Sequence, residues 1–218
     1  MNHLNKYIYK DNFYYHSSTE FFGSVVIGKK TVIEKNCSIG KPHRNDILNS
    51  LLNKIETPMQ EENTVIGDDC YIEEGTIISS GVILGNNIVC SEYSTIGQNS
   101  LIGNNSKLHY KAQIFKGVNI GSNSRIGGFI CNDSVIGDNC SVYGKLVHKY
   151  KKHEGEEIDS QVNGSPKIGN NVIIGFNSTV IGGVKIADNV YIAAGAIVTI
   201  NIPANSIVKN VNEISEWK

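Results

Sequence analysis

An apolar residue recurs at every sixth position through most of this chain, and this repeat restricts the possible folds more than any other feature. The longest unbroken series runs from Ile66 to Ile126. Shorter series cover Phe21 to Ile39, Ile136 to Val142 and Ile168 to Val198, which gives 23 positions in all. An α-helix would space apolar residues by about 3.6 positions, whereas short strands separated by corners keep a six-residue step. The chain is therefore expected to consist of short strands with a corner after each one.

The positions around each repeat residue are also patterned. Glycine often follows the apolar residue, and a small or β-branched residue such as Thr76 or Ser94 stands four positions after it. One large and one small side chain would then point inward together, as a narrow tube requires. Asparagine pairs tolerate the left-handed backbone that tight corners often use, and they occur at Asn86-Asn87, Asn104-Asn105 and Asn170-Asn171.

With these features the sequence resembles the hexapeptide-repeat acyltransferase superfamily over nearly its whole length. The resemblance implies an all-β fold, a left-handed parallel β-helix with three hexapeptides in each triangular coil, so 23 positions give about seven to eight coils. It also implies a homotrimer with active sites at the subunit boundaries. We expect a single domain of residues 1–218, in which an aromatic N-terminus and a tail of residues 204–218 with Trp217 cover the ends of the coils.

Composition narrows the classes of function. The formal net charge is −1 with no long run of either sign, so a general nucleic-acid or anionic-membrane surface is not expected. No apolar stretch approaches the roughly 18 residues of a transmembrane helix, and the N-terminus lacks the apolar core of a signal peptide. We therefore expect a cytoplasmic protein without a membrane span. The five cysteines include no CxxC pair, and we interpret them as packing residues, with a nucleophilic cysteine as the alternative.

Three interruptions of the repeat are the expected locations of function, because loops on a rigid frame usually carry it. The first, residues 41–63, predicts a short amphipathic helix that packs against a coil or a neighbouring subunit, with a lid over the substrate as the alternative. His43, beside Arg44, is interpreted as a surface or subunit-contact residue. The apolar face of the helix would contain Ile47, Leu48, Leu51, Leu52 and Ile55.

The other two interruptions follow each other in the C-terminal half. The repeat slips by two residues between positions 126 and 136, where Asn132 and Asp133 are either corner-capping residues or polar groups beside the next interruption. That interruption, residues 143–166, is the most polar stretch of the chain, and we expect strand periodicity to stop at its start. A loop of this length tends to be functional or disordered. The coils are expected to resume over residues 167–203.

The long loop contains the candidate base. In the sugar and maltose/galactoside O-acetyltransferase branch, a histidine in a projecting loop, followed by a PxIGxNVxIG segment, is the catalytic base. This sequence is similar, with VHKY followed by PKIGNNVIIG, so the resemblance implies that His148 is a general base. Imidazole suits the role because it titrates near neutral pH and can accept the proton that the acceptor loses. His153 lies in a charged run that is expected to face solvent.

The C-terminal coils contain the candidate donor site. Small residues at Ile181-Gly182-Gly183 and Ala193-Ala194-Gly195, which we expect at matching corners of adjacent coils, would let a pantetheine arm lie close to the backbone, with Gly183 as a contact. The resemblance implies acetyl-CoA or another acyl-CoA as co-substrate and no metal, with cofactor contacts at Phe176, Ala194 and Thr199. The family's VTKDIP is here VTINIP, so a lysine often near the cofactor phosphates is missing, and Lys209 is the candidate replacement.

These features together predict an acyltransferase that moves an acetyl group to an amino or hydroxyl group of a sugar or nucleotide-linked sugar. His148 would be the general base, and Asn132 and Asp133 would bind the acceptor; amino acids and antibiotics are alternative acceptors. A non-catalytic scaffold is a second hypothesis. A third is a metalloenzyme like the γ-class carbonic anhydrases, with His109, His148 and His153 as zinc ligands. His109 is expected to point outward as a corner or subunit contact.

Overall fold

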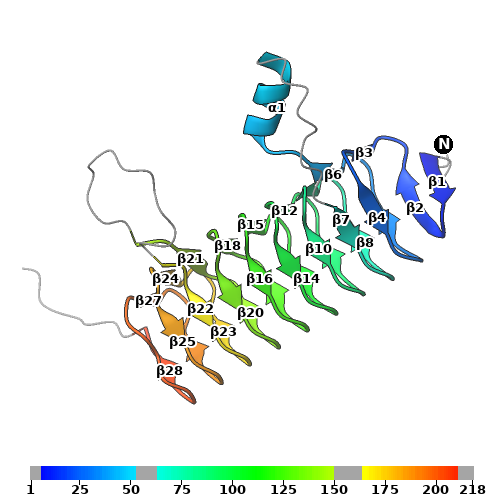
Figure 1. Cartoon of the computed structure of the whole chain (residues 1–218). Coiled ribbons are helices and arrows are strands. Elements are labelled where there is room, and N and C mark those ends of the chain that lie inside the picture. Colours follow the sequence, from blue (N-terminus) through cyan, green and yellow to red (C-terminus); the bar gives the residue numbers. More distant parts are fainter. Residues whose placement is uncertain (1–5, 53–62, 150–163, 211–218) are drawn as a thin grey trace, which may run out of the picture.

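The computed structural model describes residues 6–52, 63–149 and 164–210, and these residues form a parallel β-helix with three sheets along its length (Figure 1). Successive strands pass to sheets A, B and C in turn, so each sheet takes one strand from every full turn. We name the corners that join sheet A to sheet B the AB edge, and those that join sheet B to sheet C the BC edge. The all-β parallel fold expected from the repeat is confirmed.

The strands are short, and their bounds within the described residues are as follows. Sheet A contains β1 (Tyr7–Lys10), β2 (Phe13–His16), β5 (Val32–Ile33), β8 (Tyr71–Ile72), β11 (Val89–Cys90), β14 (Lys107–Leu108), β17 (Arg125–Ile126), β20 (Ser141–Val142), β23 (Ile173–Ile174), β26 (Tyr191–Ile192) and β28 (Ile207–Val208). Sheet B contains β3 (Glu20–Phe21), β6 (Ser38–Lys41), β9 (Ile77–Ser79), β12 (Thr95–Ile96), β15 (Gln113–Ile114), β18 (Phe129–Ile130), β21 (Lys145–Val147), β24 (Thr179–Ile181) and β27 (Ile197–Val198). Sheet C contains β4 (Val25–Ile27), β7 (Thr64–Ile66), β10 (Ile83–Leu84), β13 (Leu101–Ile102), β16 (Asn119–Ile120), β19 (Val135–Ile136), β22 (Lys167–Ile168) and β25 (Lys185–Ile186).

The described chain makes about ten turns, because sheet A holds ten consecutive parallel strands from β2 to β28. The expectation of seven to eight coils was therefore too low. Ile130, Leu146 and Ile202 also pack in or against the core, but each follows the preceding core residue by four positions and not by six. The β-helix also continues to Val208, beyond the predicted end of the coils at residue 203.

Stacking in register explains the patterned repeat. Cys90 pairs with Ile72 of the preceding turn and with Leu108 of the following turn, and all three side chains are completely buried or nearly so. The small residues of the repeat point inward beside them, and the hydroxyl groups of Thr76 and Ser94 lie 3.4 Å apart in the interior. Each turn therefore places the same kind of side chain above its predecessor.

The asparagine corners adopt the predicted backbone. Asn87, Asn105 and Asn123 have φ values near +57°, in the left-handed region that asparagine tolerates. Their side chains also form a ladder, in which the Nδ2 of Asn87 donates to the Oδ1 of Asn105 at 3.0 Å and the Nδ2 of Asn105 donates to the Oδ1 of Asn123 at 3.2 Å. Each side-chain amide thus forms one of the hydrogen bonds that the amide of the next turn requires.

Two consecutive corners of the AB edge are shortened. Only Gly127 and Gly128 join β17 to β18, and only Tyr143 and Gly144 join β20 to β21. A Cβ atom on Gly128 would overlap the carbonyl oxygen of Gly144, so the two turns can stack this closely only without that side chain. The slip was expected to include Asn132, which instead occupies an ordinary corner. The expectation that strand periodicity stops at residue 143 was also wrong, because β21 continues it to Val147.

The first interruption forms helix α1 (Arg44–Leu52), which projects from the end of β6 (Figure 1). The helix was expected to pack its apolar face on a coil or a neighbouring subunit. No residue of α1 is buried, and Leu51 and Leu52 are 72% and 74% exposed, so packing on a coil of the same chain is not observed. Ile55 lies outside the described residues. No helix in the described ranges is long and apolar enough to cross a membrane.

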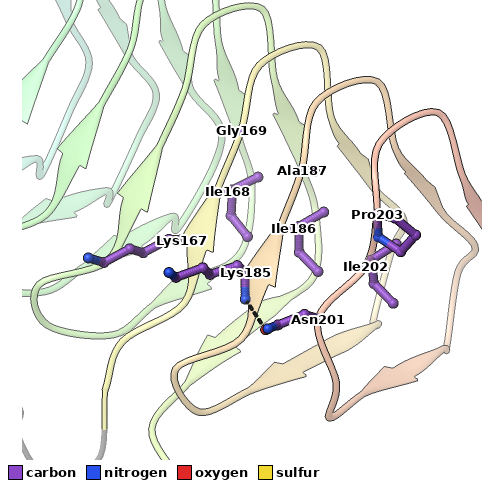
Figure 2. A pocket seen from close by; sticks show the side chains of 9 residues that line it. All are labelled: Lys167, Ile168, Gly169, Lys185, Ile186, Ala187, Asn201, Ile202 and Pro203. Carbon is purple, nitrogen blue, oxygen red and sulfur yellow. Dashed lines mark hydrogen bonds between the residues drawn. The ribbon is translucent and has the colours of Figure 1, made fainter.

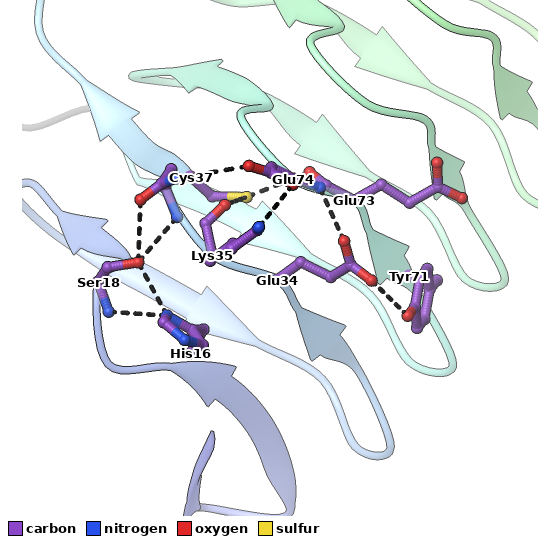
Figure 3. A network of polar contacts seen from close by, with 9 residues as sticks. His16, Ser18, Glu34, Lys35, Cys37, Tyr71, Glu73 and Glu74 are labelled. Carbon is purple, nitrogen blue, oxygen red and sulfur yellow. Dashed lines mark hydrogen bonds and ion pairs between the residues drawn. The ribbon is translucent and has the colours of Figure 1, made fainter. Parts of the chain in front are cut away.

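The N-terminal end of the β-helix contains an aromatic hairpin and a polar network. β1 pairs antiparallel with β2, and the rings of Tyr9 and Tyr14 lie 4.8 Å apart. Figure 3 shows Glu34 accepting hydrogen bonds from the Tyr71 hydroxyl at 2.7 Å and from the Glu74 backbone at 3.0 Å. The Glu34 hydrogen bond raises the pKa of Tyr71, and Lys35 forms an ion pair with Glu74 at 3.1 Å. The aromatic hairpin extends the edge of sheet A, whereas β3 and β4 are the outermost described strands of sheets B and C; Trp217 lies outside the described residues.

Candidate active site

The BC edge brings several of the predicted site residues together. The corner with Asn132 and Asp133 follows β18, His148 follows β21, Gly183 follows β24 and Thr199 follows β27. Since β18, β21, β24 and β27 are successive neighbours in sheet B, these corners stack on one another. Neighbouring strands lie about 4.8 Å apart, so adjacent members of this column are within reach of one small ligand.

The long loop leaves and rejoins the β-helix at this edge. Its predicted start at residue 143 shifts to His148, because the preceding residues form β21. The amide of Gly182 donates to the carbonyl of Val147 at 2.8 Å, which fixes the backbone just before His148. On the return, the Ser165 hydroxyl donates to the carbonyl of Asn132 at 2.6 Å, and a Cβ on Gly164 would lie 2.9 Å from Gly183. The loop ends are therefore held between the turns before and after it.

His148 is half-buried, and its Nδ1 atom is buried without a hydrogen-bond partner among the described residues. A buried polar atom without a partner is uncommon in native proteins. The ring is therefore not held by a hydrogen bond through Nδ1 to another described residue. His153 lies outside the described residues.

Asn132 and Asp133 are partly committed to their corner. The Oδ1 of Asn132 accepts a hydrogen bond from the backbone of Lys116 at 3.1 Å, and Asp133 has a φ of 57°. Asp133 is exposed, whereas Asn132 is half-buried. Both interpretations of the slip therefore hold in part: the two residues shape a corner, and that corner lies beside the long loop.

The candidate donor residues are divided between two edges. Gly183 and Thr199 lie on the BC edge with His148, but Phe176 and Ala194 lie on the AB edge, where the Gly195 amide donates to the Phe176 carbonyl at 3.0 Å. The expectation that the two small-residue corners match on adjacent coils was wrong, because residues 182 and 194 are twelve positions apart and a full turn needs about eighteen. Within one chain, Phe176 and Ala194 do not join the His148 column.

Lys209 follows β28, the last strand of sheet A, and is exposed. Sequence reasoning missed two other lysines, Lys167 and Lys185, which pair in register on neighbouring strands of sheet C (Figure 2). They line a shallow cavity of about 570 Å³ together with Asn201, whose Oδ1 accepts a hydrogen bond from the Lys185 backbone at 2.9 Å. Both lysines stand directly before a core isoleucine, eighteen residues apart, and this shared repeat position was the available signal.

His109 lies on the AB edge and does not point fully outward as expected. Its half-buried ring lies 5.5 Å from the ring of Tyr143, and its Nε2 atom is buried without a partner among the described residues. Burial lowers the pKa of His109, and Lys107 and Arg125 lower it further. His109 and His148 therefore occupy different edges, and the described ranges contain no group of three metal-binding side chains. The placement of His109 and His148 on different edges argues against their sharing a zinc ion within one chain.

All five cysteines are buried and free, which confirms the packing interpretation. Burial raises the pKa of the Cys37 thiol to about 11 and raises the pKa of Cys90 as well. The pKa of the Cys37 thiol is thus higher in the folded state than in the unfolded state, where it is about 9. The contribution of the protonated thiol to the free energy of unfolding is therefore complete below about pH 9 and is lost as the pH rises through 11.

We therefore expect the native thiols to react slowly with Ellman's reagent at pH 8, because the thiolate is the nucleophile and these groups are both protonated and covered. In guanidinium chloride all five should react at the rate of a free thiol. A native thiol that reacts as fast as free cysteine would contradict the packing interpretation.

Comparisons with known proteins agree with the fold. The family model described as "Bacterial transferase hexapeptide (six repeats)" matches residues 165–199, and "Hexapeptide repeat of succinyl-transferase" matches residues 61–91 and 94–128. The "Bifunctional protein GlmU" of Clostridium botulinum (strain ATCC 19397 / Type A) is 36% identical over 100 residues, which cover 40% of this chain and 22% of that protein. The GlmU of Streptococcus agalactiae serotype V (strain ATCC BAA-611 / 2603 V/R) is 33% identical over 108 residues, which cover 44% and 23%. The chain thus spans about a fifth of the length of these relatives.

A solved structure extends the comparison to most of the fold. The UDP-N-acetylglucosamine acyltransferase from Campylobacter jejuni has a TM-score of 0.50 at 15% identity, with 88% of this chain and 70% of that chain covered. At this identity the likeness concerns the fold alone. The six-residue repeat and the β-helix of stacked turns show that the chain is a hexapeptide-repeat protein, and the two family models that match parts of it are both described as transferase families.

Proposed function

We propose that this protein is an acyltransferase that moves an acetyl group from acetyl-CoA to an amino or hydroxyl group of a sugar or nucleotide-linked sugar. The observation that carries the proposal is His148, whose buried Nδ1 has no hydrogen-bond partner among the described residues and which lies at an edge where the backbone of Gly183 is exposed. The transferase descriptions of the matching families support the reaction class. The Campylobacter jejuni enzyme is named for a nucleotide sugar, and we adopt this class as the acceptor to test.

The proposed reaction is a direct transfer without a covalent enzyme intermediate. The acceptor nitrogen or oxygen attacks the thioester carbonyl while His148 takes the proton that the acceptor loses. A backbone amide near the Gly183 corner stabilises the oxyanion, which then collapses and expels the thiolate of CoA; the imidazolium returns the proton to that sulfur. Holding both substrates against one rigid edge supplies the proximity that such a transfer needs.

We further propose a homotrimer in which the AB edge of one chain faces the BC edge of the next. Phe176, which is 75% exposed, and Ala194 would then approach His148 of the neighbouring subunit, which they do not approach within their own chain. Lys167 and Lys185 lie on sheet C, beside the Gly183 corner. They are our candidates for the side chains that neutralise the phosphates of CoA, in place of the lysine missing from VTINIP.

The test is calorimetric titration with acetyl-CoA, succinyl-CoA and free CoA, followed by transfer assays with amino sugars and nucleotide sugars. We expect acetyl-CoA to bind, and the same preparation to sediment at equilibrium with three times the mass of the 23.8 kDa chain. Replacing both Lys167 and Lys185 by alanine should weaken CoA binding about tenfold or more. If no acyl-CoA binds, the proposal fails and the scaffold hypothesis is favoured. A monomer would contradict the shared site.

A further inference from the structure

The two insertions of this β-helix begin at the same edge. The segment that contains α1 leaves sheet B after β6, and the long loop leaves sheet B after β21, so both stand on the BC edge. Between them lie the corners that follow β9, β12, β15 and β18. This stretch of edge ends at Asn132, one turn before His148. The role proposed above leaves the first insertion without a function.

A groove of about 510 Å³ runs along this stretch. One wall is formed by residues 41–44, from the end of β6 to the start of α1, and the amide of Ser80 donates to the Lys41 carbonyl at 3.0 Å. The other wall is built from the stacked corners and includes Phe115 and Lys116. The groove thus connects the first insertion with the column of candidate active-site residues.

The charged side chains that line the groove are all positive. Lys41, Arg44 and Lys116 are exposed, and none of them forms an ion pair with another described residue. None of the described residues that line the groove is acidic. Asp46, the acidic residue of the nearby helix, has its carboxylate hydrogen-bonded to the His43 amide at 3.2 Å. Three cations without an ion-pair partner among the described residues surround one concave surface, and such a surface is suited to an anion with several oxygen atoms.

The length and the aromatic lining indicate what the anion is attached to. Three strand spacings separate β9 from β18, which is about 14 Å and longer than a single sugar ring. Phe115 is 41% exposed, and its ring lies 4.7 Å from the ring of Phe129, so an exposed aromatic surface is available beside the cations. A ligand that combines an aromatic base, a diphosphate and a sugar would match all three features.

We propose that this groove binds the diphosphate of a nucleoside diphosphate sugar, with the phosphates on Lys41, Arg44 and Lys116 and the sugar directed to Asn132 and His148. The inference rests on the proposed acyl transfer and names its acceptor. It also gives the first insertion a function, since Lys41 at the end of β6 and Arg44 at the start of α1 are two of the three cations. The donor and the acceptor would then reach His148 from opposite ends of the BC edge.

The test is calorimetric titration of the full chain, saturated with CoA so that the donor site is filled, with UDP, GDP and dTDP in turn. At least one of the three should bind, and Lys116→Ala and Arg44→Gln should each weaken that binding about tenfold or more. Lys107→Ala is the matched control, because Lys107 lies in the same turn on the outer face of sheet A; it should change binding less than about twofold. The Lys116 substitution retains the backbone hydrogen bond to Asn132, so melting temperatures should stay unchanged.

The outcomes separate this inference from the proposed function. If acetyl-CoA binds and is used but none of the three nucleotides binds, the groove assignment is overturned while the acyl transfer stands. Equal nucleotide affinity in the wild type and in the Lys116→Ala, Arg44→Gln double variant also overturns it. If acyl-CoA does not bind, the titrations are made without CoA. Nucleotide binding that the two substitutions weaken then supports the groove although the proposed transfer has failed.

Discussion

His148→Ala is expected to lower kcat by about 10²- to 10⁴-fold with acetyl-CoA and the best acceptor, because general-base catalysis contributes a factor of this size. The melting temperature should change little, since the half-buried ring forms no hydrogen bond through Nδ1 to another described residue.

His109→Ala is the matched control for this experiment. His109 is likewise half-buried, with a buried nitrogen that lacks a partner in the described ranges, but it lies on the AB edge. If His148 is the base, His109→Ala should retain most of the activity. A large loss of activity in His109→Ala together with normal turnover in His148→Ala would instead indicate a general base on the AB edge. The assignment of His148 would then be wrong.

The six-residue repeat allowed most of the fold to be predicted, because each inward residue needs only its neighbours along the chain to be recognised. Cys90 is an example: it occupies a repeat position between Leu84 and Ile96 in the sequence, and the structure buries it between Ile72 and Leu108. The first shortened corner was signalled by the slip of the repeat between residues 126 and 136, but its close contact with the second, at Tyr143 and Gly144, escaped prediction for the opposite reason. This contact depends on the fit of Gly128 against Gly144, sixteen residues later, and this fit has no local sequence signal.

The site could be predicted only in part. His148 and Asn132 were placed at one edge because both belong to interruptions of the repeat. The assignment of donor residues required a count of corners, and Ala194 falls two corners after Gly182 and therefore on another edge. The helix α1 was predicted from its amphipathic pattern, but the pattern cannot reveal what covers the exposed Leu51 and Leu52.

Gly128→Ala is expected to have the largest effect on stability. The new Cβ would overlap the carbonyl oxygen of Gly144, and neither backbone can move freely, because the Gly128 carbonyl accepts a hydrogen bond from Gln113 at 3.1 Å and the next residue of the second turn, Lys145, donates to Ser178 at 2.8 Å. The overlap could be removed only if the two turns moved apart. We expect a loss of about 2–4 kcal/mol in the free energy of unfolding, which corresponds to a decrease in melting temperature of about 5–15 °C for a chain of this size.

Gly183→Ala is the control that isolates this steric cause. Neither glycine has a φ in the left-handed region, so an added methyl group meets no backbone strain at either position. At Gly183 the nearest atom to the new Cβ would be the Cα of Gly164 at 3.4 Å, an ordinary contact, and the melting temperature should stay within about 2 °C of the wild type. Thermal unfolding followed by circular dichroism measures both variants. If Gly128→Ala melts like the wild type, the shortened corners can relax, and the close approach of the two turns does not stabilise the β-helix at this edge.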